Sequence, residues 1–74
     1  MPLIINTKEL GEQIRQLRKE KNITQRDASG LCGVGVRFLS DLENGKETIH
    51  MGKALRVLKG FGLEVYLEKR GLPK

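Results

Sequence analysis

The stretch "GVGVRFLSDLENGK", residues 33–46, decides the fold because it holds a complete helix between two turns. Leu39 and Leu42 have the spacing of an inward helix face, and Asn44-Gly45 is a strong signal for a helix end. A glycine stands where a helix usually begins with a capping side chain, so the first backbone N–H groups lack an acceptor. The sequence therefore predicts a helix that ends at Asn44-Gly45 and whose N-terminus is bare.

The composition limits the classes of protein to which the chain can belong. It has 74 residues, with 14 Lys and Arg against 9 Asp and Glu, and its net charge of +5 favours an anionic partner such as nucleic acid or a membrane surface. At this length we expect one domain that gains stability by self-association. The single Cys32 cannot form an intramolecular disulfide, and no run approaches the roughly 18 apolar residues of a membrane span. Because "MPLIIN" lacks the features of a secretion signal, a cytoplasmic location is expected.

Two more helices are predicted upstream of the opening stretch. The first runs from residue 7 to about residue 22, with Asn6 or Thr7 as its cap, and its inner face is formed by apolar residues at spacings of four and three: Leu10, Ile14 and Leu17. Thr24 caps a second, shorter helix from residue 25 to about residue 32. The chain is therefore expected to begin with three consecutive helices.

The turn between the second and third helices suggests a function. Two short helices joined by a tight turn at Gly33, on a basic chain, form the pattern of a helix-turn-helix. In that motif the N-terminus of the later helix points at DNA, where bare N–H groups and the positive end of the helix dipole suit a phosphate or a base edge. Gly35 would allow close backbone approach. The alternative is that Gly35 only ends a loop, since glycine is an acceptable cap.

A fourth helix is predicted after a short loop and is followed by a strand. The expected inner face of this helix, which Gly62 closes, consists of apolar residues at helical spacing: Met51, Leu55, Leu58 and Phe61. The period then changes, because Leu63, Val65 and Leu67 alternate with Glu64, Tyr66 and Glu68. This alternation predicts a short C-terminal β-strand with one buried face.

A lone strand needs a neighbour for its exposed N–H and C=O groups. The other strand-like segment is Leu3-Ile4-Ile5, so either the two termini pair, or the C-terminal strand pairs with its copy in a second chain, or both occur in one intermolecular sheet. The predicted organisation begins with an N-terminal arm or short strand (residues 1–6) and a helix-turn-helix DNA-binding domain (residues 7–62). A dimerising strand (residues 63–69) and a tail (residues 70–74) follow.

The run "ITQRDASGLCGVGVRFLSDLENGK", residues 23–46, resembles the Xre-type helix-turn-helix that relatives of phage lambda repressor share. The likeness extends from Leu10 to about Phe61, and its matching positions lie on or beside the first three helices: Gly11, Arg18, Thr24-Gln25, Gly33-Val34, Ser40 and Glu43-Asn44-Gly45. A short chain whose fourth helix runs straight into a C-terminal strand is also similar to the HipB-like antitoxins, including the Y4mF-type group.

The resemblance implies a mainly α, lambda-repressor-like fold of four helices, with an intermolecular sheet in a homodimer. It also implies binding to palindromic operators and to a HipA-like kinase toxin. At the level of residues, it implies a structural ion pair between Arg18 and Glu43. It further implies phosphate contacts from Gln25 and from the corner Asn44-Gly45-Lys46, which Arg26 would join.

Helical geometry predicts which residues face the DNA. If Leu39 and Leu42 face inward, the outward side chains, with Asn44 at the helix end, are Val36, Arg37, Ser40 and Asp41. Arg37 is the expected base contact, because a guanidinium can donate two hydrogen bonds to guanine O6 and N7. Asp41, one turn later, either orients Arg37 or forms an ordinary surface pair. Val36 would contact a thymine methyl group.

Three other residues favour structural roles. Phe38 either stacks on the sugar–phosphate edge or packs beside Leu42, one turn away. Cys32 falls on the inward side of its helix and is expected to be a core residue rather than a reactive thiol. His50 stands without a second histidine or another cysteine, so neither a metal site nor a cofactor is expected.

These observations favour a sequence-specific DNA-binding repressor, which the resemblance makes the antitoxin of a type II toxin–antitoxin pair that regulates its own operon. The alternative is a stand-alone transcriptional regulator without a toxin. An enzyme or a small-molecule sensor is the weakest interpretation. The sequence has no nucleophile–base pair, phosphate loop or metal-ligand spacing, and so short a chain has little room for a ligand pocket.

Overall fold

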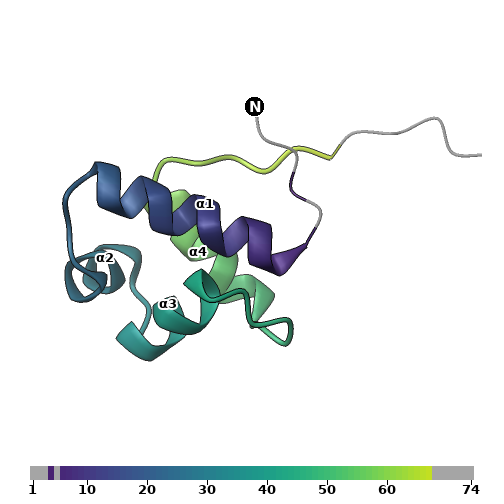
Figure 1. Ribbon diagram of the computed structural model, residues 1–74, viewed down its shortest axis with the longest axis horizontal. Coiled ribbons are helices and arrows are strands. Elements are labelled where there is room, and N and C mark those ends of the chain that lie inside the picture. Colours follow the sequence, from purple (N-terminus) through teal and green to yellow (C-terminus); the bar gives the residue numbers. More distant parts are fainter. Residues whose placement is uncertain (1–3, 5, 68–74) are drawn as a thin grey trace, which may run out of the picture.

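The computed structural model describes residue 4 and residues 6–67, and this part of the chain consists of helices joined by short turns (Figure 1). The helices are α1 (Thr7–Glu20), α2 (Gln25–Cys32), α3 (Val36–Glu43) and α4 (Met51–Gly60). α3 packs against α1 and α2, and α2 packs against α4. The predicted mainly α fold of four helices is confirmed. Among the described helices, none has the length and apolar character that crossing a membrane requires.

Local hydrogen bonds explain where the helices begin and end. Asn6 Oδ1 accepts from the Glu9 N–H at 2.9 Å, and Thr24 Oγ1 accepts from the Asp27 N–H at 3.1 Å. Each of these caps satisfies one backbone donor that the helix itself leaves unpaired. α1 ends before the expected residue 22, because Asn22 adopts a left-handed conformation with φ of 59°.

The core lies between the helices, and glycines bring those helices close together. The largest fully buried side chains come from α1, α3 and α4: Ile14, Leu39, Leu42 and Val57. A Cβ atom at Gly11 would lie 2.3 Å from the carbonyl oxygen of Leu42, and one at Gly60 would lie 2.5 Å from Cys32 Sγ. Gly11 therefore lets α1 lie close against α3, and Gly60 lets α4 lie close against α2. A larger residue at either position would push the two helices apart.

The predicted inner face of α4 is wrong at two positions. Met51 and Leu55 are 65% and 45% exposed. The buried stripe begins instead at a small residue and keeps helical spacing: Ala54, Val57, Leu58 and Phe61. The helical spacing of large apolar side chains predicts that this segment is a helix with an apolar face. Which face of the helix is buried depends on how closely its side chains pack against the neighbouring helices. Met51 and Leu55, one turn apart, therefore form an exposed apolar strip.

The segment after α4 leaves the helical bundle. The chain turns at Gly62, whose φ is 74°, and continues as an extended segment over residues 63–67 (Figure 1). Leu63 is half-buried against the core, while Val65 and Leu67 are 58% and 97% exposed. Residues 63–67 pair with no other described segment as a strand. Residues 68 and 69, and residues 3 and 5 of the possible partner, lie outside the described residues, so the shared sheet stays a prediction.

Candidate nucleic-acid interface

The N-terminus of α3 is bare in the folded chain. Gly35 occupies the cap position with φ of −73° and ψ of 154°, and no side chain accepts a hydrogen bond from the first turn. An added Cβ at Gly35 would meet nothing within 4 Å, and the negative φ is accessible to any residue. The fold itself therefore does not require glycine here, and the uncovered N–H groups remain available to a ligand.

The outer face of α3 carries the residues predicted to contact bases. Val36 is 42% exposed and Arg37 is exposed, while Ser40 and Asp41 are half-buried beside them. Asn44, at the end of the helix, is exposed. Within the described part of the chain, the Arg37 side chain makes no hydrogen bond or ion pair. Its guanidinium can therefore offer all its donors to a ligand.

Asp41 pairs with Lys46 rather than with Arg37. The Asp41 Oδ2 to Lys46 Nζ distance is 3.7 Å, and the two side chains are 36% and 54% exposed. At that exposure the pair adds little to stability. Asp41 therefore neither orients Arg37 nor pairs with it, as the sequence suggested it would; it forms an ordinary surface pair with the lysine of the Asn44-Gly45-Lys46 corner.

The Asn44-Gly45-Lys46 corner rests on the start of α1. Gly45 has φ of 77°, and a Cβ there would lie 2.6 Å from Lys8 Cα. Thr7 Oγ1 donates to the carbonyl of Gly45 at 2.8 Å. The exposed Lys8 therefore stands next to the predicted phosphate-binding corner. Sequence reasoning missed Lys8, because its position depends on packing between segments far apart in the chain.

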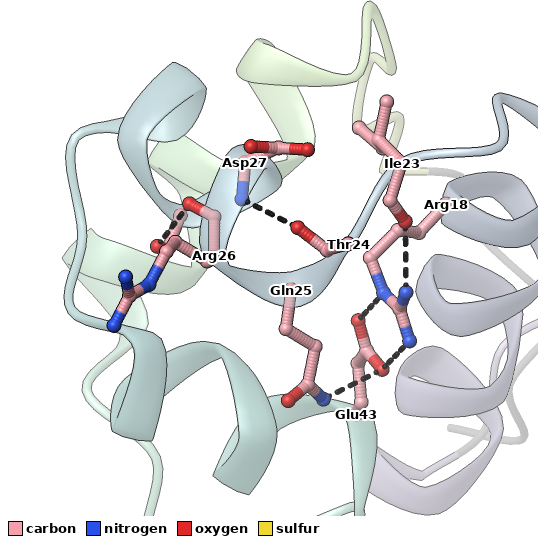
Figure 2. Close-up of polar contacts among 8 residues, drawn as sticks. Arg18, Ile23, Thr24, Gln25, Arg26, Asp27 and Glu43 are labelled. Atoms are coloured by element: carbon pink, nitrogen blue, oxygen red, sulfur yellow. Dashed lines mark hydrogen bonds and ion pairs between the residues drawn. The ribbon is translucent and has the colours of Figure 1, made fainter.

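A buried ion pair joins α1 to the end of α3 (Figure 2). Arg18 Nε donates to Glu43 Oε2 at 2.7 Å and Arg18 Nη2 donates to Glu43 Oε1 at 3.1 Å, while the side chains of Arg18 and Glu43 are only 13% and 2% exposed. The hydrogen bond to Glu43 raises the pKa of Arg18. The structure thus brings the predicted pair together in the fork-to-carboxylate geometry that favours arginine.

Two further groups complete this ion pair. Arg18 Nη1 donates to the carbonyl of Ile23 at 2.9 Å, just before α2. Gln25 Nε2, in the first turn of α2, donates to Glu43 Oε1 at 3.1 Å. Figure 2 shows the Gln25 and Arg18 side chains converging on the same carboxylate. No feature of the sequence near Gln25 predicts this bond, because Glu43 lies on another helix.

Arg26 lies outside this network. Its side chain is exposed and points away from Glu43 in Figure 2, while its backbone carbonyl accepts from Ser29 Oγ at 2.8 Å. Phe38 is half-buried against the core, which confirms the packing interpretation, and Lys53 Nζ lies 5.8 Å from its ring centroid. α4 thereby places a cation on the flank of α3.

Cys32 and His50 have structural roles in the described chain. Cys32 is buried, its Sγ lies 3.7 Å from the carbonyl oxygen of Val57, and burial raises the pKa of its thiol. The expected core role of Cys32 is confirmed. His50 Nδ1 caps α4 by accepting from the Lys53 N–H at 3.2 Å. Among the described residues, no cluster of histidine, cysteine and acidic side chains is arranged to hold a metal.

A family model and two related proteins match the part of the chain that carries this surface. A family model described as "Helix-turn-helix" (HTH_3) matches residues 14–67, a range that includes α2, α3 and α4. The "Uncharacterized HTH-type transcriptional regulator y4mF" of Sinorhizobium fredii (strain NBRC 101917 / NGR234) is 44% identical over 57 residues, which cover 77% of this chain and 75% of that protein. The "HTH-type transcriptional regulator DdrOP3" of Deinococcus deserti is 30% identical over 57 residues, which cover 77% of this chain and 44% of that protein.

Solved structures share the fold. Chains in the structures described as "HipB-O4 20mer complex" and "Structure of HipA-HipB-O2-O3 complex" each superpose with a TM-score of 0.84. Each alignment covers 93% of this chain and 97% of the other, at 17% sequence identity. At that identity the likeness shows a common fold, and any shared residue roles need separate evidence.

Proposed function

The chain belongs to the helix-turn-helix family of DNA-binding transcriptional regulators, and on that premise we propose that it is a repressor which binds an inverted-repeat operator as a homodimer. One observation carries the proposal. α3 presents an uncapped N-terminus and an unpaired Arg37 on its outer side, while its inner side is fully buried. A short helix of this kind is suited to the major groove, where side chains reach base edges.

The proposed roles follow the position of each residue. Arg37 reads a base, and Gly35 lets the backbone at the start of α3 approach the duplex closely, while Val36, Ser40 and Asp41 lie along the same groove. Other polar and basic residues hold phosphates and fix the register without reading sequence: Gln25, Arg26, Asn44 and Lys46. Lys8, packed beside Gly45, extends this backbone contact.

Exposed apolar side chains support the homodimer. The side chains of Val65 and Leu67 extend past the helices and are exposed. Met51 and Leu55 form a second exposed apolar strip, on α4. Large apolar side chains exposed on a small domain favour association with a copy of the same chain. In the proposed dimer residues 63–69 form the shared sheet, with Leu63 packed on its own core, and the two α3 helices lie about 34 Å apart, so that they enter successive major grooves.

Selection of bound duplexes from a random pool tests this proposal. The retained sequences should contain an inverted repeat whose half-sites are about one helical turn apart. Sedimentation of the protein alone should show a dimer at micromolar concentration, and removing residues 63–74 should yield monomer. Recovery of no common sequence, or a monomer unaffected by the deletion, would argue against a dimeric repressor.

We further propose that the chain is the antitoxin of a type II toxin–antitoxin pair, and that its toxin is a HipA-like kinase. The supporting observation is the fold shared with a chain in the structure described as "Structure of HipA-HipB-O2-O3 complex". Autoregulation of the operon and a cytoplasmic location are part of this proposal. The second candidate is a stand-alone regulator, which the y4mF description as a transcriptional regulator equally supports.

A neighbouring gene separates the two candidates. An antitoxin should adjoin a reading frame with a kinase pattern, and co-expression should restore growth that the kinase alone arrests. A tagged chain should then retain the kinase on a column. A genomic neighbourhood without such a frame, or continued growth arrest during co-expression, would leave the stand-alone regulator as the function.

A further inference from the structure

We infer that the buried Arg18–Glu43 pair positions Gln25 for contact with the DNA backbone, and thereby affects DNA affinity through Gln25. The inference rests on the proposed function, because it assigns a role to residues behind the same DNA-facing surface. Arg18 and Glu43 are positioning residues in this account, since neither side chain is exposed enough to bind the duplex itself.

Hydrogen-bond chemistry fixes the orientation of the Gln25 side chain. An ionised carboxylate only accepts hydrogen bonds, so the group that Gln25 directs at Glu43 must be its amide nitrogen. That contact is 3.1 Å long and ends on Oε1, the same oxygen that Arg18 Nη2 reaches. One Gln25 N–H is thereby held inward, and the second N–H stays available at the start of α2. A phosphate oxygen is a suitable acceptor for it.

The same ion pair fixes both proposed backbone-contacting sites relative to each other. Arg18 holds the carbonyl of Ile23 just before α2, while Glu43 is the last residue of α3 and directly precedes the Asn44-Gly45-Lys46 corner. The start of α2 and the end of α3 therefore share a single support (Figure 2). Two contacts along one phosphate backbone require such a constant separation.

Stability alone gives a weak reason for this arrangement. Burying a carboxylate that is 2% exposed costs desolvation, and the attraction to Arg18 roughly offsets that cost. A pair of apolar residues would hold α1 and α3 together equally well, but it would leave the Gln25 amide to rotate. The geometry therefore points to orientation of Gln25 as a specific consequence of the ion pair.

A double-mutant cycle on a short duplex of random sequence tests the inference. Gln25→Ala should weaken binding about three- to ten-fold, as the loss of one hydrogen bond, and should leave the salt dependence unchanged because glutamine carries no charge. Glu43→Gln supplies one oxygen, which Arg18 occupies, and turns an N–H toward Gln25. In that background Gln25→Ala should change affinity less than about two-fold. Gln16→Ala, which removes an exposed amide on α1, is the matched control and should have no effect in either background.

The outcomes are distinguishable from failure of the proposed function. If the unaltered protein binds no duplex, the proposed function fails. If it binds and Gln25→Ala has the same effect in both backgrounds, or none in either, only the inference is overturned. Should Glu43→Gln prevent folding, nitrogen–proton spectra of the unaltered protein decide the matter. One Gln25 side-chain proton signal should shift when DNA is added while its partner stays, and two unmoved signals would overturn the inference.

Discussion

The two ends of α3 differ in how they are supported. The N-terminal end has Gly35 with open space around it and no cap. The C-terminal end is held by the Arg18 pair at Glu43, by Thr7 at Gly45 and by the close approach of Lys8. The comparison shows that only the C-terminal end of this short helix is held by polar side-chain contacts and close backbone approach, while its buried face packs on the core. Its position is set by the rest of the fold, and its other end remains open to the duplex.

The largest expected effect comes from breaking the support at the C-terminal end. Arg18→Ala leaves the Glu43 carboxylate buried without its cation, so we expect the free energy of unfolding to fall by about 3 to 5 kcal/mol. Urea unfolding followed by helical circular dichroism measures it. Lys46→Ala, which breaks the exposed pair with Asp41, is the control and should cost less than about 1 kcal/mol. Equal losses in the two variants would show that burial does not distinguish these pairs.

Glycine replacements compare the two ends directly. Gly45→Ala forces an L-residue into φ of 77° and places its Cβ against Lys8, so we expect a loss of about 2 to 3 kcal/mol in unfolding free energy. Gly35→Ala meets no neighbour and keeps a common φ, so its loss should stay within about 1 kcal/mol. Thermal unfolding of both variants checks the difference, and a costlier Gly35→Ala would reverse the comparison.

The open end of α3 should govern sequence recognition. Arg37→Ala should lose about 1 to 3 kcal/mol of binding free energy on the selected operator and less on random duplex, with unfolding unchanged. Lys46→Ala should weaken binding to both duplexes and lower the salt slope by about one. Titrations at several salt concentrations separate the two roles. An Arg37→Ala loss that is equal on both duplexes would make Arg37 a phosphate contact instead.

The smallest effect, and the sharpest contrast, is expected from adding a cap. Gly35→Ser supplies an acceptor for the bare N–H groups, which should raise the free energy of unfolding by a few tenths of a kcal/mol. The same hydroxyl occupies groups proposed for DNA, so operator affinity should fall while stability rises. Parallel unfolding and binding measurements test this opposition. A variant that gains in both would mean that the bare end is not used in binding.

Local signals made much of the fold predictable. The cap at Thr24 and the turn signals at Gly33 and Asn44-Gly45 act within a few residues, so the sequence alone predicted α2 and the end of α3. The placement of Arg18 beside Glu43 came from the family resemblance, since residues so far apart along the chain give no local sign of contact.

What the sequence did not predict depends on packing between distant segments. Met51 and Leu55 were expected inside, but Ala54 fits the neighbouring helices better. The partner of Asp41, the position of Lys8 and the bond from Gln25 to Glu43 all arise where separate elements meet. Helical periodicity indicates that a segment is an amphipathic helix, whereas its exact buried face and these contacts depend on three-dimensional fit.

The burial of Cys32 has a practical consequence for chemical labelling. It is the single cysteine of the chain, it lies under α4, and burial raises the pKa of its thiol, so maleimides and similar reagents should modify it slowly. A cysteine introduced by Val36→Cys would be exposed and should react much faster. A fluorophore or spin label can therefore be attached to the start of α3 without first removing the native sulfur.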